Sequence, residues 1–324
     1  MRKLQRSWSS LEGTYILPIR AADASQATEL ADYFRQLGPL EIIVVDGSPA
    51  DVFAVHSDRW AQLAVHMPPA GDIPGANGKT RGVLTGLRHA GYEKVIVADD
   101  DVRYDRGALR FVLAALDAYG AVLPQNYFSP APWHAILDTG RTLLNRVTGG
   151  DWPGTVGVRK SFLRDGYNAD VLFENFEMVR TVEANGALVL RADDCYVLRR
   201  PPSAKRYWLQ RVRQAYDEFA RPRRLVAQLS ILPALGVALW LRRYRLLFGA
   251  ALLCVLAAEC GRRKSNGARY FPATASLAAP LWVLERAICA WVAVYIRVAH
   301  GGVKYAGTRI LHAATERGLG RRAA

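Results

Sequence analysis

A short apolar run that ends in three consecutive acids is the feature that most restricts how this chain can fold. Residues 95–98 (Val-Ile-Val-Ala) have the composition of a strand buried on both faces, and Asp99, Asp100 and Asp101 follow directly. In open α/β sheets, ligands gather beyond the carboxyl ends of the strands. Carboxylate oxygens suit Mg²⁺ or Mn²⁺, so the run predicts a metal site at the edge of a parallel sheet. The alternatives are a solvated acidic loop and acids that cap a helix beginning near Asp105.

The residues before this run supply the other elements of such a sheet. Three segments are expected to be strands: 14–18, 41–45 and 63–66. Two segments between the strands are expected to be helices: 25–37 and 80–90. Alternating strands and helices are typical of one parallel sheet, in which the carboxyl ends of the strands share an edge. We therefore expect Asp46, Lys79 and the acids at 99–101 to lie at one edge.

In their order and spacing, these segments resemble the nucleotide-sugar-dependent glycosyltransferases of family 2, which have the GT-A fold. The resemblance covers residues 14–216, about two thirds of the chain. Three segments in the first half carry it: 41–48, which is similar to the family's EIIVVDDGS with one Asp missing; 78–79 with the helix that follows; and 99–101, which matches the DxD acids. Three further segments follow: 154–159, similar to the acceptor-side strand; 174–175, followed by Gly186, similar to the ED pair; and 210–213, similar to the first four residues of QxxRW. It implies an α/β fold in which a mostly parallel, Rossmann-like sheet is flanked by helices.

The resemblance also implies roles for the matched residues. Asp46 would hold the base and ribose of the nucleotide, and Asp99 and Asp101 would bind the ribose and the metal on the diphosphate. Lys79 and Arg213 would stabilise the departing diphosphate, although a solvated basic side chain is the alternative for both. The residues expected to bind the donor are Asp46, Lys79, Asp99, Asp100 and Gln210.

The sequence leaves the general base open. Asn175 stands where the family has the acid of the ED pair, and an amide cannot accept a proton in that way. Glu174 and Glu177 lie within one helical turn, and Glu174 is the expected base. Gln214 replaces the Trp of the last motif, so the lid over the diphosphate is only partly specified, and Trp208 is the candidate substitute. The expected catalytic positions are Glu174, Asn175 and Arg213.

Charge divides the chain near residue 220. Residues 1–220 hold 26 basic and 26 acidic side chains, whereas residues 221–324 hold 17 and 3, so the tail supplies the whole net charge of +14. We expect a GT-A domain over 1–220 and a basic, apolar, helical, membrane-associated tail over 221–324. Nucleic acid is not an expected partner, because long apolar runs are the wrong surface for phosphates.

The tail contains three apolar stretches: 225–241, 246–258 and 277–298. The longest uncharged run has 17 residues, fewer than the ~20 that a membrane span needs. Basic clusters on both sides of the runs disfavour translocation of the linkers, so we expect helices in the interface at the cytoplasmic face. The alternative is a soluble helical domain.

Other features bear on localisation and on the acceptor. Residues 1–8 lack an apolar signal region, so we expect the catalytic domain in the cytosol. The four cysteines show no zinc-ligand spacing and are expected to be reduced. Residues 124–154, rich in Pro, Gly and aromatic residues, are expected to be irregular and to shape the acceptor pocket.

These features together predict an inverting, metal-dependent glycosyltransferase on the cytoplasmic side of the cell membrane. Its donor is expected to be a nucleotide-sugar, namely a UDP-sugar, and its acceptor a lipid or lipid-linked molecule, because a site held against a bilayer suits substrates that cannot leave it. A polyprenyl phosphate is an alternative acceptor, and as an anion it needs no general base. A non-catalytic membrane scaffold that retains the GT-A fold is the alternative from another class.

Overall fold

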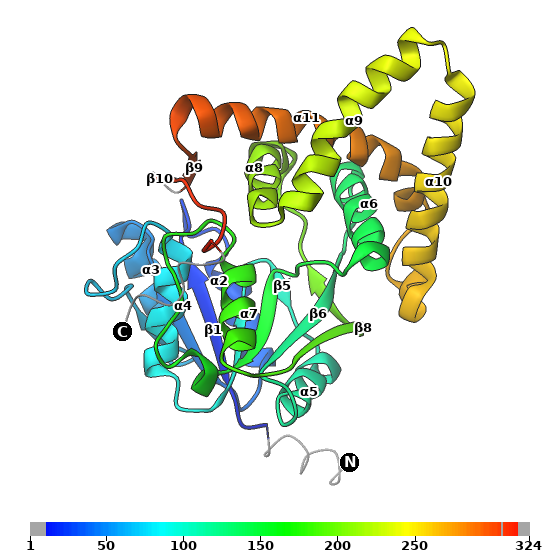
Figure 1. The fold of residues 1–324 in the computed structure, drawn as a ribbon. Helices are drawn as coiled ribbons and strands as arrows, with labels where there is room; N and C mark the ends of the chain where they lie inside the picture. Colours follow the sequence, from blue (N-terminus) through cyan, green and yellow to red (C-terminus); the bar gives the residue numbers. More distant parts are fainter. Residues whose placement is uncertain (1–10, 306, 317–324) are drawn as a thin grey trace. The chain divides into compact units, whose positions relative to one another are not determined.

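Figure 1 shows the computed structural model of the chain, which describes residues 11–305 and 307–316. The chain forms two compact units. Within the described residues, the first unit consists of 11–126, 152–170 and 174–198, and the second of 127–151, 171–173 and 199–316 without residue 306. Neither unit is one continuous segment of the chain.

The first unit is built on an eight-stranded sheet with the strand order β3-β2-β1-β4-β7-β6-β8-β5. Its strands are β1 (Thr14–Ile19), β2 (Glu41–Asp46), β3 (Val65–Met67), β4 (Lys94–Ala98), β5 (Val102–Arg103), β6 (Ala121–Phe128), β7 (Thr155–Arg159) and β8 (Val189–Arg199). The strands β3, β2, β1 and β4 pair in parallel, whereas β7 is antiparallel to both β4 and β6. The parallel half confirms the alternation predicted from the sequence.

Helices cover both faces of this sheet. They are α2 (Ala27–Gln36), α3 (Ala50–Trp60), α4 (Gly78–His89), α5 (Arg106–Ala115) and α7 (Glu174–Ala184), with the short 3₁₀ helix η1 (Lys160–Leu163). Successive strand residues point to opposite faces. Along β1, Tyr15 and Leu17 therefore join the core that contains α2 and α5, while Ile16 joins the core that contains α4 and α7. Burial on both faces explains the apolar runs of the central strands.

Two glycines let α4 approach the sheet closely. A Cβ atom at Gly86 would lie 2.6 Å from Cγ2 of Ile16, and one at Gly82 would lie 3.1 Å from Cβ of Pro18. Ordinary van der Waals contact begins near 3.4 Å, so larger residues would push the helix away from β1. The glycines thus set the depth at which α4 lies and, with it, the position of its N-terminal end.

The second unit is helical. Its elements are α6 (Trp133–Thr148), α8 (Ala204–Tyr216), the 3₁₀ helix η2 (Asp217–Ala220), α9 (Pro222–Trp240), α10 (Tyr244–Arg263), the 3₁₀ helix η3 (Lys264–Arg269), α11 (Ala273–His300) and a hairpin of β9 (Val303–Tyr305) and β10 (Thr308–Ile310). The helix α11 packs closely against α6, where a Cβ atom at Gly140 would lie 3.0 Å from Cα of Ala279. Buried charges join α6 to α8, because Asp138 pairs with Arg141 and with Arg211, each at 3.0 Å.

Two expectations differ from the structure. Residues 124–154 were expected to be irregular, but they contain the whole of α6. The helical pattern was hidden because some polar residues of α6 are buried; Arg146, for example, donates to the carbonyl oxygens of Gly261 and Lys264 at 2.9 and 2.7 Å. The boundary expected at residue 220 does not coincide with the division into units, because α6 and α8 pack with the later helices.

The apolar tail forms longer helices than its uncharged runs suggested. The helix α9 continues through Pro233, and α10 and α11 include the charged residues near their ends. Two segments, Tyr244–Arg269 and Ala273–His300, are long and apolar enough to cross a membrane by length and composition, each with a mean hydropathy of 1.6. One face of α11 is buried in the second unit, and the core helix of a soluble protein passes the same test.

Candidate active site

The acids after β4 lie in a tight turn. The backbone N–H of Val102 donates to the carbonyl oxygen of Asp99 at 3.1 Å, which leaves Asp100 and Asp101 at the corners of the turn. The N–H of Asp99 donates to the carbonyl oxygen of Gly154 at 2.8 Å and ties the turn to the segment before β7. All three acids are thus held beyond the carboxyl end of a central parallel strand, as predicted.

Helix capping was one alternative role for these three acids. The residue that caps the next helix is Asp105 instead. Its side chain accepts a hydrogen bond from the N–H of Ala108 at 2.8 Å in the first turn of α5. Arg103 donates to the carbonyl oxygen of Asp100 at 2.7 Å and pairs with Glu29 at 2.7 Å. Backbone groups and Arg103 therefore fix the shape of the turn.

Lys79 reaches this turn from the N-terminal end of α4. The buried amide oxygen of Asn77 accepts hydrogen bonds from the backbone N–H groups of Lys79 and Thr80 at 3.0 and 3.3 Å, which fixes where the helix begins. The Lys79 ammonium lies 2.5 Å from Oδ1 of Asp99 and also pairs with Oε1 of Glu174, the first residue of α7. The side chains of Lys79, Asp99 and Glu174 are 16, 19 and 16% exposed. A cation therefore lies between two carboxylates that solvent reaches only in part.

The candidates for the general base at the start of α7 differ in their exposure to solvent. Asn175 is buried, and its amide nitrogen donates to the carbonyl oxygen of Pro153 at 2.9 Å, so this side chain holds the segment before β7. Glu177 is only 6% exposed, whereas the carboxylate of Glu174 is partly open beside Lys79. Of the two carboxylates, Glu174 is the more accessible to a substrate.

Tyr167 adjoins this cluster and was not singled out from the sequence. Burial, and to a smaller extent the charge of Glu174, raise the pKa of its phenol, so the hydroxyl keeps its proton at neutral pH. The ring shares a core with Val83 of α4. No motif marks this residue, because its position depends on the fold of the loop between η1 and α7.

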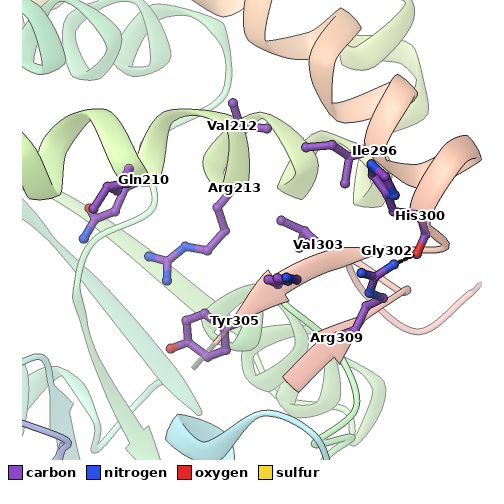
Figure 2. Close-up of a pocket in the computed structure, with 11 residues that line it drawn as sticks. Gln210, Val212, Arg213, Ile296, His300, Gly302, Val303, Tyr305 and Arg309 are labelled. Atoms are coloured by element: carbon purple, nitrogen blue, oxygen red, sulfur yellow. Dashed lines mark hydrogen bonds between the residues drawn. The ribbon is translucent and has the colours of Figure 1, made fainter. Parts of the chain in front are cut away.

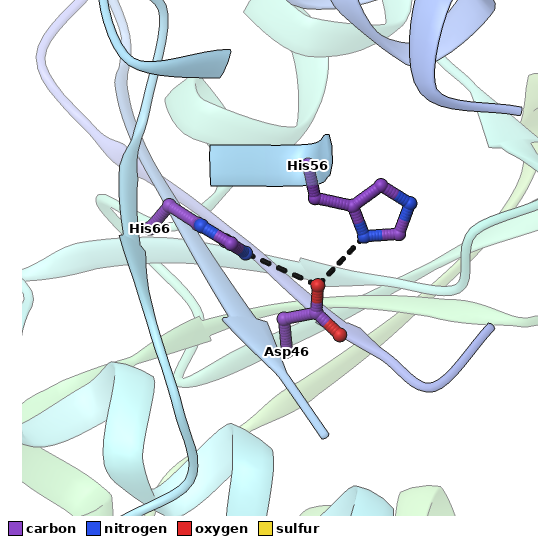
Figure 3. A group of neighbouring side chains, drawn as sticks. All are labelled: Asp46, His56 and His66. Atoms are coloured by element: carbon purple, nitrogen blue, oxygen red, sulfur yellow. Dashed lines mark hydrogen bonds and ion pairs between the residues drawn. The ribbon is translucent and has the colours of Figure 1, made fainter. Parts of the chain in front are cut away.

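Asp46 ends β2 and is enclosed by hydrogen-bond donors (Figure 3). Its Oδ2 atom lies 2.7 Å from Nδ1 of His56 and 3.1 Å from Nε2 of His66, and its Oδ1 atom accepts a bond from the backbone N–H of Ser48 at 2.8 Å. Burial alone would raise the pKa of Asp46, but the hydrogen bonds from His66, Ser48 and His56 outweigh it and hold the pKa at about 2. The carboxylate therefore stays charged in the interior.

The side chains of Asp46, His56 and His66 form one hydrogen-bonded group. Among the described residues, Asp46, His56 and His66 are a group whose ligand atoms all lie within 4.8 Å of one another. Two ligands of a tetrahedral zinc ion lie about 3.3 Å apart, so the 2.7 Å between His56 and Asp46 is the separation of a hydrogen bond. The sequence does not indicate these histidines. His66 reaches Asp46 only because β3 pairs with β2, with His66 opposite Val44. The contact of Asp46 with the nucleotide stays a prediction.

Gln210 and Arg213 lie on α8 in the second unit, where both line a pocket (Figure 2). The guanidinium of Arg213 lies 4.8 Å from the centre of the Tyr305 ring. Trp208, the candidate for the missing lid residue, is half exposed and lies 6.2 Å from the ring of Trp133. The predicted contacts of these α8 residues with the donor stay predictions.

The strand order and the acids beyond the central strand define an α/β fold of the GT-A class, as the sequence predicted. Residues 28–167 match the profile of glycosyl transferase family 2. The resemblance drawn from the sequence is thereby confirmed. No curated protein matches the chain.

Solved structures with this fold include the mannosyltransferase PcManGT from Pyrobaculum calidifontis, in complex with GDP-Man and Mn²⁺. It is 20% identical to this chain, and the match covers 86% of each chain with a TM-score of 0.57, which shows a shared fold. Two more distant similarities are to glucosyl-3-phosphoglycerate synthase from Mycobacterium tuberculosis (14% identity, 63% of this chain and 77% of that chain, TM-score 0.43) and to mannosyl-3-phosphoglycerate synthase from Rubrobacter xylanophilus (16% identity, 63% and 71%, TM-score 0.42).

Proposed function

We propose that this chain is an inverting glycosyltransferase that moves a sugar from a nucleotide-sugar, namely a UDP-sugar, to a lipid or lipid-linked acceptor at the cytoplasmic face of the cell membrane. The observation that carries the catalytic part is the group of Lys79, Asp99 and Glu174 beyond the strand ends of a family 2 domain. This group offers a cation and two carboxylates, which suit a reaction in which a diphosphate leaves and a proton is removed.

The donor set fits a divalent metal ion. Asp99 and Asp101 lie on one turn and offer hard oxygen ligands, and an ammonium group already lies against Asp99. We propose that these two acids hold Mg²⁺ or Mn²⁺, the second of which is present in the PcManGT complex. When bound, the ion would neutralise charge on the departing diphosphate.

Glu174 is the proposed general base for a hydroxyl acceptor. The acceptor oxygen attacks C1 of the sugar, its proton passes to the Glu174 carboxylate, and the C1–O bond to the diphosphate breaks with its electron pair on the leaving oxygen. In the structure this carboxylate is paired with Lys79. Movement of the Lys79 ammonium toward the diphosphate would free Glu174 and place positive charge where negative charge develops.

A polyprenyl phosphate is the second candidate acceptor. The pairing of Glu174 with Lys79 and the hydrogen bond from Asn175 to Pro153 favour it, because an anionic acceptor carries no proton that a base must remove. The two candidates share the donor and differ in their need for Glu174.

The membrane part of the proposal rests on the hairpin of α9 and α10, whose connecting loop projects from the rest of the second unit (Figure 1). Large apolar side chains are exposed along it: Val237, Leu239, Trp240, Leu241, Tyr244, Leu246, Phe248, Leu252, Leu253 and Leu256. The loop between the helices carries Arg242 and Arg243. We propose that this hairpin inserts into the interface of an anionic membrane, with its basic residues at headgroup level.

Donor binding can be tested by thermal shift with the full chain in neutral detergent, using UDP- and GDP-sugars with and without Mn²⁺. We expect a UDP-sugar to raise the Tm only when the metal is present, and EDTA to abolish the rise. If a donor binds but nucleoside diphosphate is never released from it, the chain is a non-catalytic membrane scaffold that retains the GT-A fold. Absence of any shift with every donor would contradict the proposal.

A further inference from the structure

A pocket of about 570 Å³ opens in the second unit between α8, the C-terminal end of α11 and the β9–β10 hairpin (Figure 2). Its cationic side chains come from all three elements: Arg213 from α8, His300, when protonated, from α11, and Lys304 and Arg309 from the hairpin. Among the described residues, none of those that line it is acidic. In the part of the chain that the structure describes, no ion pair joins Arg213, Lys304 or Arg309 to a carboxylate.

The hairpin brings two of these cations directly together. Lys304 and Arg309 are partners in the antiparallel register of β9 and β10, so both side chains project from the same face. Like charges in opposite positions of a strand pair destabilise it. An anion bound between the two side chains would remove this repulsion.

Backbone geometry fixes the hairpin against the end of α11. Gly301 ends the helix with φ 64°, and its N–H donates to the carbonyl oxygen of Arg297 at 3.1 Å. Gly302 has φ 135°, and a Cβ atom there would lie 2.5 Å from the carbonyl oxygen of Ile310. Only glycine fits this position, so the close contact between the turn and β10 is built into the sequence.

Two of the cationic side chains, Arg309 and Arg213, are held in defined positions. The guanidinium of Arg309 donates to the carbonyl oxygen of His300, and that of Arg213 lies 4.8 Å from the centre of the Tyr305 ring (Figure 2). A fixed group of cations recognises a phosphate better than mobile surface lysines, because less side-chain entropy is lost on binding.

The rest of the wall is apolar. Leu209 and Val212 from α8, Ile296 from α11 and Val303 from β9 line it, and Leu209 is 73% exposed. A small inorganic anion would leave this surface uncovered, whereas a phosphate that carries a hydrocarbon chain would cover it.

We propose that this pocket binds the phosphate of a lipid phosphate monoester. Lys304, Arg309 and Arg213 contact the phosphate, and the apolar side chains contact the first carbons of the chain. The purpose of the site rests on the proposed function, in which such a lipid is a candidate acceptor, but the binding itself does not. It can be measured without any nucleotide donor.

The test uses the full chain in neutral detergent and isothermal titration with hexyl phosphate, inorganic phosphate and hexyl glucoside. Hexyl phosphate should bind at least about tenfold more tightly than either comparison ligand. In the double variant Lys304→Ala/Arg309→Ala its affinity should fall at least about tenfold. The matched control Lys205→Ala/Arg206→Ala, which loses the same charge at exposed positions in the first turn of α8 outside the pocket lining, should bind as the unaltered chain does.

Three results would overturn the inference. Equal binding of inorganic phosphate would mean a site for a free anion, and equal binding of hexyl glucoside would mean an apolar groove alone. Equal losses in both double variants would mean general electrostatic attraction. If the Lys304→Ala/Arg309→Ala variant does not fold, Lys304→Met is the second variant. It keeps the aliphatic part of the side chain, removes one charge of the repelling pair and should still weaken the binding of hexyl phosphate. Hexyl phosphate binding without any sugar transfer would count against the proposed function only.

Discussion

Asp46 illustrates what a strand-end acid gains from its tertiary surroundings. Its place at the end of β2 follows from the apolar run before it, but the donors that keep it charged come from α3 and β3. Pairing of β3 with β2 brings one of them, His66, across twenty residues of chain. The periodicity of apolar residues along the chain predicts local elements, so it does not predict the contact between His66 and Asp46.

The hydrogen bonds to Asp46 predict a pH-dependent contribution to stability. Its pKa is about 2 in the folded state, against about 3.9 in an unfolded chain, so the charged form contributes about 2–3 kcal/mol above pH 4. This contribution is lost as the pH falls from 4 toward 2. We expect Asp46→Asn to lower the free energy of unfolding by about that amount at pH 7, and by clearly less at pH 3, in urea titrations.

Asp51→Asn is the matched control for this measurement. Asp51 is an exposed acid on the neighbouring helix α3, so its substitution should leave the unfolding free energy within about 0.5 kcal/mol. A loss at Asp46 that is equally large at pH 7 and pH 3 would contradict the assigned hydrogen bonds.

Glu174 is the residue at which the two candidate acceptors differ. For a hydroxyl acceptor, Glu174→Gln should lower kcat by about 10²-fold or more while the donor affinity changes little. Turnover with saturating donor and acceptor, together with donor affinity from titration, measures both quantities. Glu177→Gln is the control, because that side chain is buried. Near-normal turnover of the Glu174 variant would exclude it as the base and favour a phosphate acceptor.

The elements of the first unit could be predicted further than those of the second. Strands β1, β2 and β4 are buried on both faces and give unbroken apolar runs, and the acids after β4 mark the edge where they end. In α6, by contrast, Asp138 and Arg146 are buried with partners on other helices, although the sequence alone would place such residues in solvent. Pairing between distant charges is visible only once the helices have packed.

The helix α4 shows how packing of one element positions a site residue. We expect Gly86→Ala to destabilise the fold by about 1–3 kcal/mol, because its Cβ atom would lie 2.6 Å from Ile16 and displace the helix that carries Lys79. Gly78→Ala is the control in the same helix, where a Cβ atom meets nothing within 4 Å, and it should be neutral or slightly stabilising. Urea unfolding of both variants gives the comparison, and equal effects would contradict the packing argument.

At the level of the whole chain, the charge division near residue 220 was visible in the sequence, but the compact units were not. Because α6 and α8 pack with α10 and α11, truncation near residue 221 would uncover the buried faces of α6 and α8. Membrane association is therefore better tested by substitutions on the exposed surface of the hairpin of α9 and α10.

We expect the full chain to remain with membranes in 1 M salt, because apolar insertion is not screened while headgroup attraction is. The triple variant Leu246→Ser/Phe248→Ser/Leu253→Ser should be released into the supernatant, since all three side chains are exposed on α10. Leu188→Ser, at an equally exposed position of the first unit, should pellet like the unaltered chain in sedimentation with anionic vesicles. Release of the unaltered chain by salt alone, or pelleting of the triple variant, would contradict insertion of the hairpin.

The central claim is that the acids after β4 support metal-dependent sugar transfer. Release of nucleoside diphosphate from the donor, followed with Mn²⁺ and the full chain, tests it most directly when Asp99→Asn is compared with Asp117→Asn, an exposed acid elsewhere in the first unit. We predict slow release by the unaltered chain and by Asp117→Asn, and a loss of about 10²-fold or more in Asp99→Asn or in EDTA. Equal release by both variants, unaffected by EDTA, would contradict the claim.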